Sequence, residues 1–575
     1  MITVDTKTGK SFEIMCDFIE NDVIKGLPSR RFNAKKRVWV APCLSRNVEY
    51  LLKHAPNAKW TPKAAEVRDE VTSSTRVPAP APIPLNYIFK TEPFEKQLEA
   101  VSKFWNRNYG AWFMGTGTGK SKTLIDLIAV KYMDNQINAA VVTCPATVKL
   151  PWLKTQWTAH CPVPYKCYVH DGDLDKLAAF NAEPFDGLKV VMVSTEAFSV
   201  GAWERMVKGL EQFFLCHRVL FAVDEGHDVK NHKSGRTEQV IKLGKFCSQR
   251  FLMTGTPIDE GIMDLFAYFE FLNPQILGFG DFYSFRARYA IMGGYEDKQI
   301  VSYQNVDELL TLVEPHIFQC SKDEMKDMPD KLYQRRYVKM TPAMSKHYKT
   351  LTRELNLSVE QAGIDHDIEN VLEKMMLQQF IASGFFSYNK IVGDPDAEEI
   401  ELERDVHVIE EIPPKVRECL KWIEQDVPKG ASVIIWSRWT LEAELIAKLL
   451  GEKYGHDQVL WLRGGMGAAK KDVMREKFEA REARFFVAHP AAGGVGLTLN
   501  AATFTAYLSN TFRYLHRQQS EDRNHRIGQE HNVTYMDFIT EGTVDEHVLE
   551  AIAQKHNVAT WVDKTIRDKR SLRNG

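Results

Sequence analysis

Two long stretches of the chain alternate short apolar runs with longer segments that suit amphipathic helices. The runs of the first stretch are Ala139–Thr143, Val190–Val193 and Val219–Val223, and those of the second are Ser432–Trp436, Val459–Leu462, Phe485–Ala488, Thr505–Ser509 and Val533–Phe538. Short buried strands separated by helices are typical of a parallel α/β sheet. The pattern therefore predicts an α/β protein with two sheet lobes in tandem.

The segments around these stretches predict further boundaries. Residues 61–93 hold six prolines, five of them, at 62 and at 78–84, among alanines and polar residues, which favours an extended linker. This linker separates a small N-terminal module, residues 1–60, from a first lobe at 94–275. The pattern then predicts a helical insertion and inter-lobe linker at 276–412, a second lobe at 413–545 and a basic tail at 546–575.

Composition fits this division and excludes several classes of protein. A chain of 575 residues is long enough for three or four domains of roughly 100–200 residues each. With 44% hydrophobic and 26% charged residues, the chain is expected to fold as a globular protein. Its nine scattered cysteines include no CxxC pair, which argues against a disulfide framework or a zinc ribbon. With no apolar run near ~18 residues and no leader pattern after Met1, we expect a cytoplasmic protein without a membrane partner, of bacterial or viral origin.

Charge is distributed unevenly along the chain. Residues 1–60 carry 11 Lys/Arg against 6 Asp/Glu, and residues 551–575 carry 6 against 2. Such basic ends can attract nucleic acid, although a solvated surface is the commoner explanation of any one cluster. Residues 394–411 hold nine Asp/Glu and one Arg, which indicates a solvated linker, with an acidic mimic for a basic surface as the alternative.

A glycine-rich loop lies between the candidate strand Gly110–Phe113 and a helix-compatible segment. The loop contains Gly115, Gly117 and Gly119, followed by Lys120 and Ser121, while Met114 stands where the full motif has its first glycine. The glycines allow main-chain amides to wrap a triphosphate, Lys120 neutralises the β- and γ-oxygens, and the Ser121 hydroxyl holds Mg²⁺. A plain glycine-rich turn is the alternative for this loop taken alone.

Two carboxylates follow the buried run Val219–Val223. Asp224 and Glu225 stand at the carboxyl end of this strand, where open α/β sheets bind their ligands. Asp224 is expected to hold Mg²⁺, and Glu225 to orient and deprotonate the water that attacks the γ-phosphate. A surface acidic pair is the alternative for an isolated Asp-Glu. Together with the glycine loop, the pair predicts an ATP-hydrolysing enzyme.

These motifs resemble those of the superfamily-two helicases, and within them the Swi/Snf-type translocases on double-stranded DNA. The resemblance covers most of residues 94–545. Residues 224–227 are similar to the Asp-Glu-Ala-His box, with Gly226 in place of alanine, and residues 253–258 are similar to the Thr-Gly-Thr-Pro coupling motif. The resemblance implies RecA-like lobes, a role for Gln97 in reading adenine, and DNA-backbone contacts from Pro145, Ser194 and Thr195.

The second lobe carries the longest of the resembling motifs. Residues 519–529 read Gln-Ser-Glu-Asp-Arg-Asn-His-Arg-Ile-Gly-Gln and are similar to the last motif of the family. The resemblance implies that Arg523 and Arg526 are arginine fingers, bidentate donors to the γ-phosphate. It also implies that the loop with Gly494, Gly496 and Thr498 links nucleotide to DNA, and that Ser437 and Arg438 contact a DNA phosphate.

Two further motifs depart from the family pattern. Cys320-Ser321-Lys322 replaces paired arginines ahead of the inter-lobe segment, and Phe512-Arg513-Tyr514 replaces a Trp-Asn-Pro before the last motif. Neither departure changes a residue expected to act on ATP. We therefore expect an active enzyme whose lobes are coupled in their own way.

The N-terminal module resembles the small HARP-type module of annealing helicases. Its alternation around Arg37–Val40 predicts a hairpin strand. Five basic residues lie close to Phe32 and suit phosphate contacts: Arg30, Arg31, Lys35, Lys36 and Arg37. Trp39 is expected in the core of so small a module, with base stacking as the alternative.

The leading hypothesis is an ATP- and Mg²⁺-dependent translocase on double-stranded or branched DNA that anneals or remodels forks and junctions. Replication or recombination proteins are candidate partners, and we expect a monomer. A single-strand DNA or RNA helicase of the same superfamily is the second hypothesis. A binding protein with an inactive motor is the third, and the intact Lys120, Glu225 and arginines argue against it.

Overall fold

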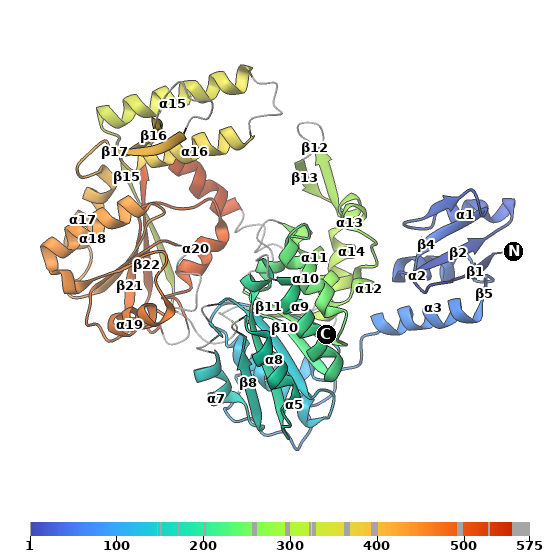
Figure 1. Ribbon diagram of the computed structural model, residues 1–575. Coiled ribbons are helices and arrows are strands. Elements are labelled where there is room, and N and C mark those ends of the chain that lie inside the picture. The colour runs from blue at the N-terminus through green and yellow to red at the C-terminus, as the bar shows by residue number, and fades with distance from the viewer. Residues whose placement is uncertain are drawn as a thin grey trace. The chain divides into compact units, whose positions relative to one another are not determined.

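The structure is a computed structural model. It describes residues 2–554 apart from 147, 150–151, 171, 200–202, 256–260, 294–298, 321–323, 325–328, 362–367, 393–400, 491–497 and 527–528. These residues fall into two compact units (Figure 1), one that holds the N-terminal module with the first lobe and one that holds the second lobe. In the described residues no helix is long and apolar enough to cross a bilayer.

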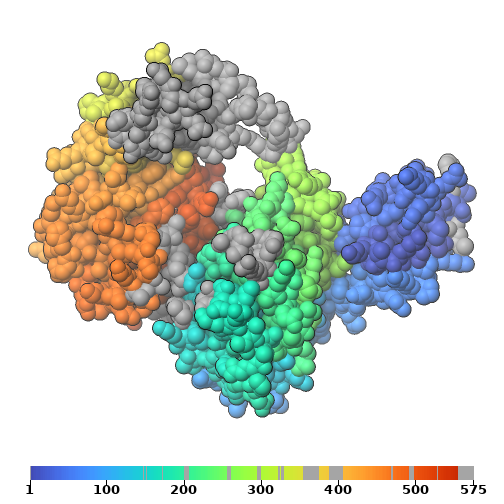
Figure 2. All heavy atoms as spheres, in the orientation of Figure 1, coloured from blue at the N-terminus to red at the C-terminus, as the bar shows by residue number. Residues whose placement is uncertain are grey.

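The first 60 residues form a small body (dark blue in Figure 2), whose core also includes Ala64 and Val71 of the segment that follows. Its sheet has the order β3-β4-β2-β1-β5. The elements are β1 Thr3–Asp5, β2 Ser11–Met15, α1 Asn21–Lys25, β3 Arg31–Asn33, β4 Val38–Pro42, α2 Ser45–His54 and β5 Lys59–Trp60. Phe12, Ile14 and Leu51 are fully buried between the sheet and the helices. The predicted hairpin is present as the antiparallel pair β3–β4.

The extended conformation predicted for residues 61–93 is wrong for its first half. Pro62–Thr75 form helix α3, and the Thr61 hydroxyl caps it by accepting from the amide of Ala64. Pro62 is tolerated because it occupies the first helical turn, where its missing amide hydrogen has no partner to lose. The other five prolines, four within residues 78–84 and Pro93, lie beyond the helix, in a segment without helix or strand.

The sheet of lobe 1 is entirely parallel and has the order β14-β6-β11-β10-β7-β9-β8. Its strands are β6 Tyr109–Met114, β7 Ala139–Cys144, β8 Tyr165–Val169, β9 Leu188–Ser194, β10 Val219–Val223, β11 Gln249–Thr254 and β14 Ile317–Cys320. Successive residues of β6 enter opposite cores, Ala111 and Phe113 on one face and Trp112 and Met114 on the other. Both faces are therefore buried, which explains the unbroken apolar runs.

Helices cover both faces of this sheet. They are α4 Glu95–Phe104, α5 Lys120–Met133, α7 Thr158–His160, α8 Leu174–Ala182, α9 Trp203–Cys216, α10 Gly235–Gly244, α11 Leu265–Leu272, α12 Pro274–Leu277, α13 Phe282–Tyr289 and α14 Val306–Val313, and a hairpin pairs β12 Ala290–Gly293 with β13 Gln299–Tyr303. Helices α4 and α5 contribute to one core, and α9 to α11 with α13 and α14 contribute to the other.

Lobe 2 repeats this plan with the order β15-β22-β21-β18-β20-β19, again all parallel. Its strands are β15 Lys331–Val338, β18 Ser432–Trp436, β19 Val459–Leu462, β20 Phe485–Ala488, β21 Ala502–Tyr507 and β22 Val533–Thr540. Its helices are α15 Pro342–Gln361, α16 Ile368–Ala382, α17 Pro414–Gln425, α18 Thr440–Tyr454, α19 Ala468–Glu479 and α20 Tyr514–Glu521. The α/β fold with two tandem RecA-like parallel-sheet lobes is thus confirmed.

The segment 276–412 is less helical than predicted. It supplies β14 to the sheet of lobe 1 and β15 to the sheet of lobe 2, so each sheet extends beyond its predicted limits. Residues 401–408 of the acidic run form β17 Glu401–Val408, which pairs with β16 Phe385–Val392. Strand β15 carries three basic residues among exposed positions, so its pattern is not that of a buried strand. The rest of the acidic run that precedes β17, and the tail beyond residue 554, lie outside the described residues.

Candidate functional site

The glycine loop joins the end of β6 to the start of α5. Gly117 and Gly119 both have φ of +84°, a left-handed conformation that side chains rarely adopt. A Cβ atom on Gly119 would lie 2.2 Å from the side-chain nitrogen of Gln97, so any other residue would displace Gln97 in addition to straining the main chain. The sequence thus places glycines where the main chain turns sharply and where another residue approaches it.

Lys120 is the first residue of α5 and is largely buried. Its ammonium group donates to the main-chain carbonyls of Met114, at 3.0 Å, and Gly115, at 3.4 Å. Ser121 follows in the first turn of the helix, where main-chain amides have no partner within the helix. An anion at this end of the helix can therefore draw on the lysine, the hydroxyl and the amides together.

Gln97 lies in α4, the helix that precedes β6, and is buried. Its side-chain oxygen accepts from the amide of Phe94 at 3.1 Å, while its nitrogen end lies against Gly119. The residue expected to read adenine is therefore next to the loop expected to hold phosphate.

Asp224 follows β10 and reaches the same edge of the sheet as the glycine loop, because β6, β11 and β10 are parallel. Its amide donates to the carbonyl of Thr143 at 2.8 Å, and its carboxylate accepts from the amide of Glu225 at 3.0 Å. Burial and the charge of Glu225 raise the pKa of the Asp224 carboxyl to about 7, against the opposing effect of Lys120. The ammonium and the carboxylate are thus close enough to interact.

The donor set at this edge fits Mg²⁺. Among the described residues there is no group of three His, Cys, Asp or Glu able to hold a metal. A magnesium ion commonly takes only one or two protein oxygens and completes its shell with waters and substrate phosphates. The buried Asp224 carboxylate and the Ser121 hydroxyl supply oxygen donors of this kind.

Glu225 has a strained main chain. Its φ and ψ are +52° and +58°, a left-handed conformation that is unusual for glutamate and is concentrated at functional sites. His227 places Nδ1 at 3.3 Å from a carboxylate oxygen of Glu225. The next residue explains one departure from the family motif, since a Cβ on Gly226 would come within 2.6 Å of the Leu252 side chain. Glycine is therefore required next to Leu252.

The residues expected to grip DNA from lobe 1 lie at the ends of two neighbouring strands. Pro145 follows β7, and Ser194 ends β9, with Cys144 and Ser194 directly paired in the sheet. The Ser194 hydroxyl accepts from the amide of Ala197, and Thr195 is fully buried. In the coupling motif, Thr254 ends β11 and is buried, whereas residues 256–258 lie outside the described part.

In lobe 2 the two expected fingers lie just beyond helix α20. Arg523 is buried, and its carbonyl accepts from the amide of Leu499 at 2.8 Å. Arg526 donates to the hydroxyl of Thr498 at 3.0 Å. The structure therefore brings a predicted nucleotide residue and a predicted DNA residue into direct contact. Gly494 and Gly496 lie outside the described residues.

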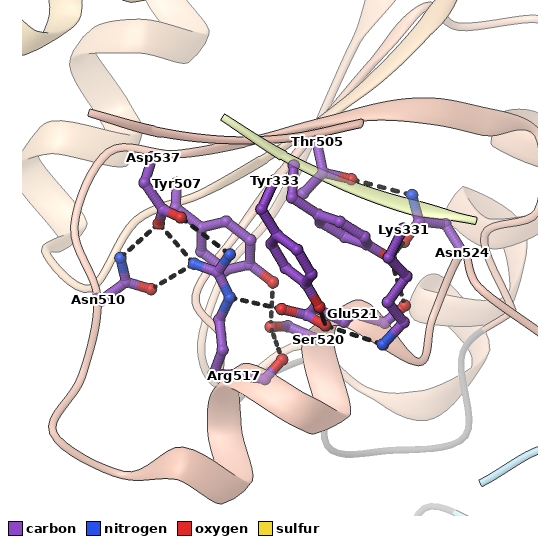
Figure 3. Close-up of polar contacts among 11 residues, drawn as sticks. Lys331, Tyr333, Thr505, Tyr507, Asn510, Arg517, Ser520, Glu521, Asn524 and Asp537 are labelled. Atoms are coloured by element: carbon purple, nitrogen blue, oxygen red, sulfur yellow. Dashed lines mark hydrogen bonds and ion pairs between the residues drawn. The ribbon is translucent and has the colours of Figure 1, made fainter. Parts of the chain in front are cut away.

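Helix α20 is fastened by a buried polar network that the sequence analysis missed (Figure 3). Arg517 donates to both carboxylate oxygens of Asp537 on β22, at 2.5 and 3.0 Å, and to Glu521 at 2.7 Å. Lys331 and Tyr333, both on β15, reach the other oxygen of Glu521 at 2.9 and 2.7 Å. No local signal marks these residues, because about 200 positions separate β15 from the rest.

Ser437 and Arg438 are placed after β18, as the motif predicts, but their side chains are engaged within the lobe. Ser437 is buried and donates to Glu442 at 2.7 Å. Arg438 donates to Gln379 at 2.5 Å and stacks over Trp439. Burial lowers the pKa of this guanidinium. Their role at a DNA phosphate stays a prediction.

The basic residues of the N-terminal module follow the β3–β4 hairpin and are exposed. Arg30 and Arg31 lie at the start of β3, Lys35, Lys36 and Arg37 lie in the turn before β4, and Lys36 pairs with Glu13 at 2.7 Å. Phe32 is 52% exposed and lies 5.1 Å from the ring of Trp39. Trp39 packs against the core of the module and donates to Asn21, in line with the core interpretation.

Helix α2 of the module contacts lobe 1. Arg46 donates to the carbonyl of Leu277, to the hydroxyl of Tyr289 and to the carboxylate of Glu308, at 2.6–2.8 Å. Its guanidinium also lies 4.1 Å from the ring centre of Phe279. Burial alone would raise the pKa of Glu308, but hydrogen bonds from Arg288 and Arg46 outweigh it and lower that pKa to about 2. The contact therefore pairs the guanidinium of Arg46 with the ionised carboxylate of Glu308.

Comparison with known proteins supports the motif assignments. Residues 100–383 match the SNF2-related domain. The chain is 23% identical over 478 residues to the "Probable ATP-dependent DNA helicase CHR12" of Arabidopsis thaliana, covering 80% of this chain and 40% of that one. It therefore spans less than half the length of this relative. It is also 23% identical over 556 residues to the SWI/SNF-related matrix-associated actin-dependent regulator of chromatin subfamily A-like protein 1 homolog of Caenorhabditis elegans, covering 93% and 72%.

Solved structures give a weaker match. The SWI2/SNF2 ATPase core of Sulfolobus solfataricus in complex with double-stranded DNA aligns at 20% identity with a TM-score of 0.36, over 85% of this chain and 97% of that one. The match over residues 100–383 and the sequence relatives show that this chain is similar to SNF2-related, helicase-like proteins.

Proposed function

We propose that the protein is an ATP-dependent translocase on double-stranded or branched DNA, which anneals strands or remodels forks and junctions. The observation that carries this proposal is the shared edge of β6, β11 and β10, where Lys120, Thr254 and Asp224 meet. A lysine, a helix start and a buried carboxylate at one edge form the parts of a phosphoryl-transfer site.

In lobe 1, each residue has a separate task. Gln97 faces the adenine, the amides of the glycine loop and Lys120 bind the β- and γ-phosphates, and Ser121 and Asp224 would hold Mg²⁺. The ion, when bound, neutralises charge on the phosphate oxygens. Glu225 orients the attacking water and takes its proton while the bond between the γ-phosphorus and the bridging oxygen breaks.

In lobe 2, Arg523 and Arg526 supply positive charge to the γ-phosphate during hydrolysis. The contact of Arg526 with Thr498 supports a link between this step and DNA, since Thr498 belongs to the loop expected to join the two sites. Nucleotide-dependent opening and closing of the lobes then moves the protein along the duplex.

The N-terminal module gives the preference for branched DNA. Its exposed basic hairpin suits phosphates, and the exposed Phe32 suits a base freed at a junction. Because Arg46 fastens helix α2 to lobe 1, the module is expected to move with this lobe. The similarity of the chain to the Caenorhabditis elegans relative over 93% of its length includes part of this module.

The test is the rate of ATP hydrolysis by the full chain with matched ligands: single-stranded DNA, blunt duplex, fork, four-way junction and duplex RNA. We expect the greatest stimulation with fork or junction DNA. Stimulation by RNA but not by duplex DNA would support the second hypothesis and reject this one. Nucleotide binding without turnover on any ligand would support the inactive-motor hypothesis.

A variant of the N-terminal module tests whether the preference for fork DNA comes from its basic hairpin. We would replace Arg31 and Lys35 by serine and Arg37 by asparagine, which tolerates the φ of +52° found there. The variant should keep duplex-stimulated hydrolysis and lose the excess on forks. The control replaces Lys7, Lys10 and Lys53, three exposed lysines of the same module, by serine. An unchanged fork preference in the hairpin variant would assign the module to stability or to protein recruitment.

A further inference from the structure

The connection that enters lobe 2 is bonded to both sides of Arg523. Lys331 and Tyr333 contact the same carboxylate oxygen of Glu521, which is two residues before Arg523. On the other side, His525 donates from Nε2 to the carbonyl of Pro329 at 2.7 Å. His525 is two residues after Arg523 and directly precedes Arg526. Residues 329–333 thus hold the segment from which both arginines project.

Residues 329–333 lie where the chain passes from lobe 1 to lobe 2. Strand β14 ends at Cys320 in the sheet of lobe 1, and β15 begins at Lys331 in the sheet of lobe 2. Ten residues join the two strands, and ten residues reach at most about 36 Å when fully extended. Pro329, Lys331 and Tyr333 thus lie at the lobe 2 end of the connection.

The polar network has two halves with different attachments. Arg517, Asp537 and Asn510 anchor α20 to β22 and to the end of β21, inside lobe 2. Lys331 and Tyr333 approach the end of the same helix from the edge strand β15. The first half fixes the helix in the lobe, and the second half ties its last residue to the connection.

The electrostatics keep Glu521 and Lys331 ionised. Burial alone would raise the pKa of Glu521, but the charges of Lys331 and Arg517 outweigh it and lower that pKa to about 2. The same pairing raises the pKa of Lys331 against the opposing effect of burial. The carboxylate accepts on both oxygens, from Arg517 on one and from Lys331 and Tyr333 on the other, so a shift of β15 must move it.

We propose that Lys331 and Tyr333 are positioning residues, which transmit the movement of the inter-lobe connection to Arg523 and Arg526 through Glu521. The proposal rests on the function proposed above, in which these arginines act on the γ-phosphate. It adds a reason why hydrolysis depends on lobe movement: strain in the connection alters the placement of the arginines.

The experiment uses two substitutions in the full chain, Tyr333→Phe and Lys331→Met. Tyr333→Phe removes one hydroxyl and leaves the ring stacked on Tyr535, at 5.5 Å between centroids. The strand offers a matched control, because Tyr337 is 54% exposed and Tyr333 is 58% exposed. Tyr337→Phe and the exposed Lys339→Met are therefore the controls. Lys331→Arg keeps the charge and serves as the conservative variant.

Four quantities are measured for each protein: kcat with saturating fork DNA, KM for ATP, the affinity for DNA and the Tm. We expect Lys331→Met to lower kcat about tenfold and Tyr333→Phe to lower it several-fold, since small misplacements of catalytic groups have effects of this size. KM, DNA affinity and Tm should stay near the values of the controls. Lys331→Arg should recover most of the lost rate.

The outcomes separate this proposal from the function on which it rests. If the unmodified protein shows no DNA-stimulated hydrolysis, the proposed function fails and this proposal fails with it. If stimulation is present but both variants keep the kcat of the controls, only the positioning role is rejected. A fall in kcat that is matched by a fall in Tm also rejects it, in favour of a structural role. If Lys331→Met fails to fold, the decision rests on Tyr333→Phe. Tyr333 is 58% exposed, so the loss of its hydroxyl should change the stability little.

Discussion

The catalytic edge of lobe 1 and the arginine segment of lobe 2 are held in place by different means. In lobe 1, Lys120 bonds to main-chain carbonyls and Asp224 accepts from a main-chain amide. In lobe 2, the segment that carries Arg523 is fastened by ion pairs between buried side chains. In lobe 1, strand ends and glycines set the positions of the functional residues. In lobe 2, a few side chains that are far apart in the sequence set them.

The difference predicts that the removal of a side chain has different costs in stability at the two places. A side chain held by the main chain can be replaced without removing a partner that other residues need. A side chain in a buried ionic network leaves an uncompensated charge when its partner is removed, which costs about 3–5 kcal/mol. Substitutions at the lobe 1 edge should therefore change activity with little loss of stability, whereas removal of Arg517, the cation shared by Asp537 and Glu521, should lower the stability of lobe 2.

The largest effect on activity is expected for Glu225→Gln. The rate of DNA-stimulated ATP hydrolysis should fall about 10²–10⁴-fold because the base that takes the proton of water is lost. The Tm should be unchanged, since Glu225 is at a strand end and contacts His227 rather than the core. Glu238→Gln, at an exposed position of the same lobe, is the control. A large loss of Tm in Glu225→Gln would break the contrast between the lobes.

The largest effect on stability is expected for Arg517→Ala. Asp537 and Glu521 would lose their shared partner, and the free energy of unfolding of lobe 2 should fall by about 3–5 kcal/mol. Urea unfolding, followed by the fluorescence of the lobe 2 tryptophans, measures the change. Arg335→Ala, at an exposed position of β15, should have almost no effect. Equal stability of the two variants would show that the network contributes little.

The smallest effects concern two glutamates with opposite pKa shifts. Glu270 lies on α11, where burial raises the pKa of its carboxyl to about 7. Glu521 has a pKa of about 2, because nearby cations outweigh burial. The ordinary value is 4.5 for both. Ionised Glu270 thus opposes folding at pH 8, and ionised Glu521 favours it.

The free energy of unfolding, measured as a function of pH, tests whether the two glutamates act in opposite directions. Glu270→Gln should stabilise lobe 1 by about 1 kcal/mol at pH 8, and this gain should shrink as the pH falls from 7 to 4.5, where the native carboxyl is protonated but the unfolded one is still ionised. Glu521→Gln should destabilise lobe 2 at every pH above 4.5. That difference should shrink only as the pH falls from 4.5 toward 2. A common pH dependence for both variants would show that the cations around Glu521 do not set its ionisation.

Much of the fold and of lobe 1 could be predicted because the signals are local. Unbroken apolar runs identified buried parallel strands, and the glycine loop and Asp224 lie at the ends of such runs. Strand β15 escaped prediction because it is an edge strand with exposed positions, and helix α3 was hidden by the prolines that follow it. The partners of Glu521 could not be found, because contacts between positions 331 and 521 leave no periodic pattern.

The pairing of β15 with β22 also constrains the order in which the protein can fold during synthesis. The sheet of lobe 1 is complete once Cys320 has left the ribosome. Residues 331–338 must instead wait for residues 533–540, their sheet neighbours some 200 positions later. Lobe 1 can therefore fold early, while β15 of lobe 2 stays unpaired until residues 533–540 have been synthesised. The second half of the chain is accordingly the part that most needs protection from aggregation as it is made.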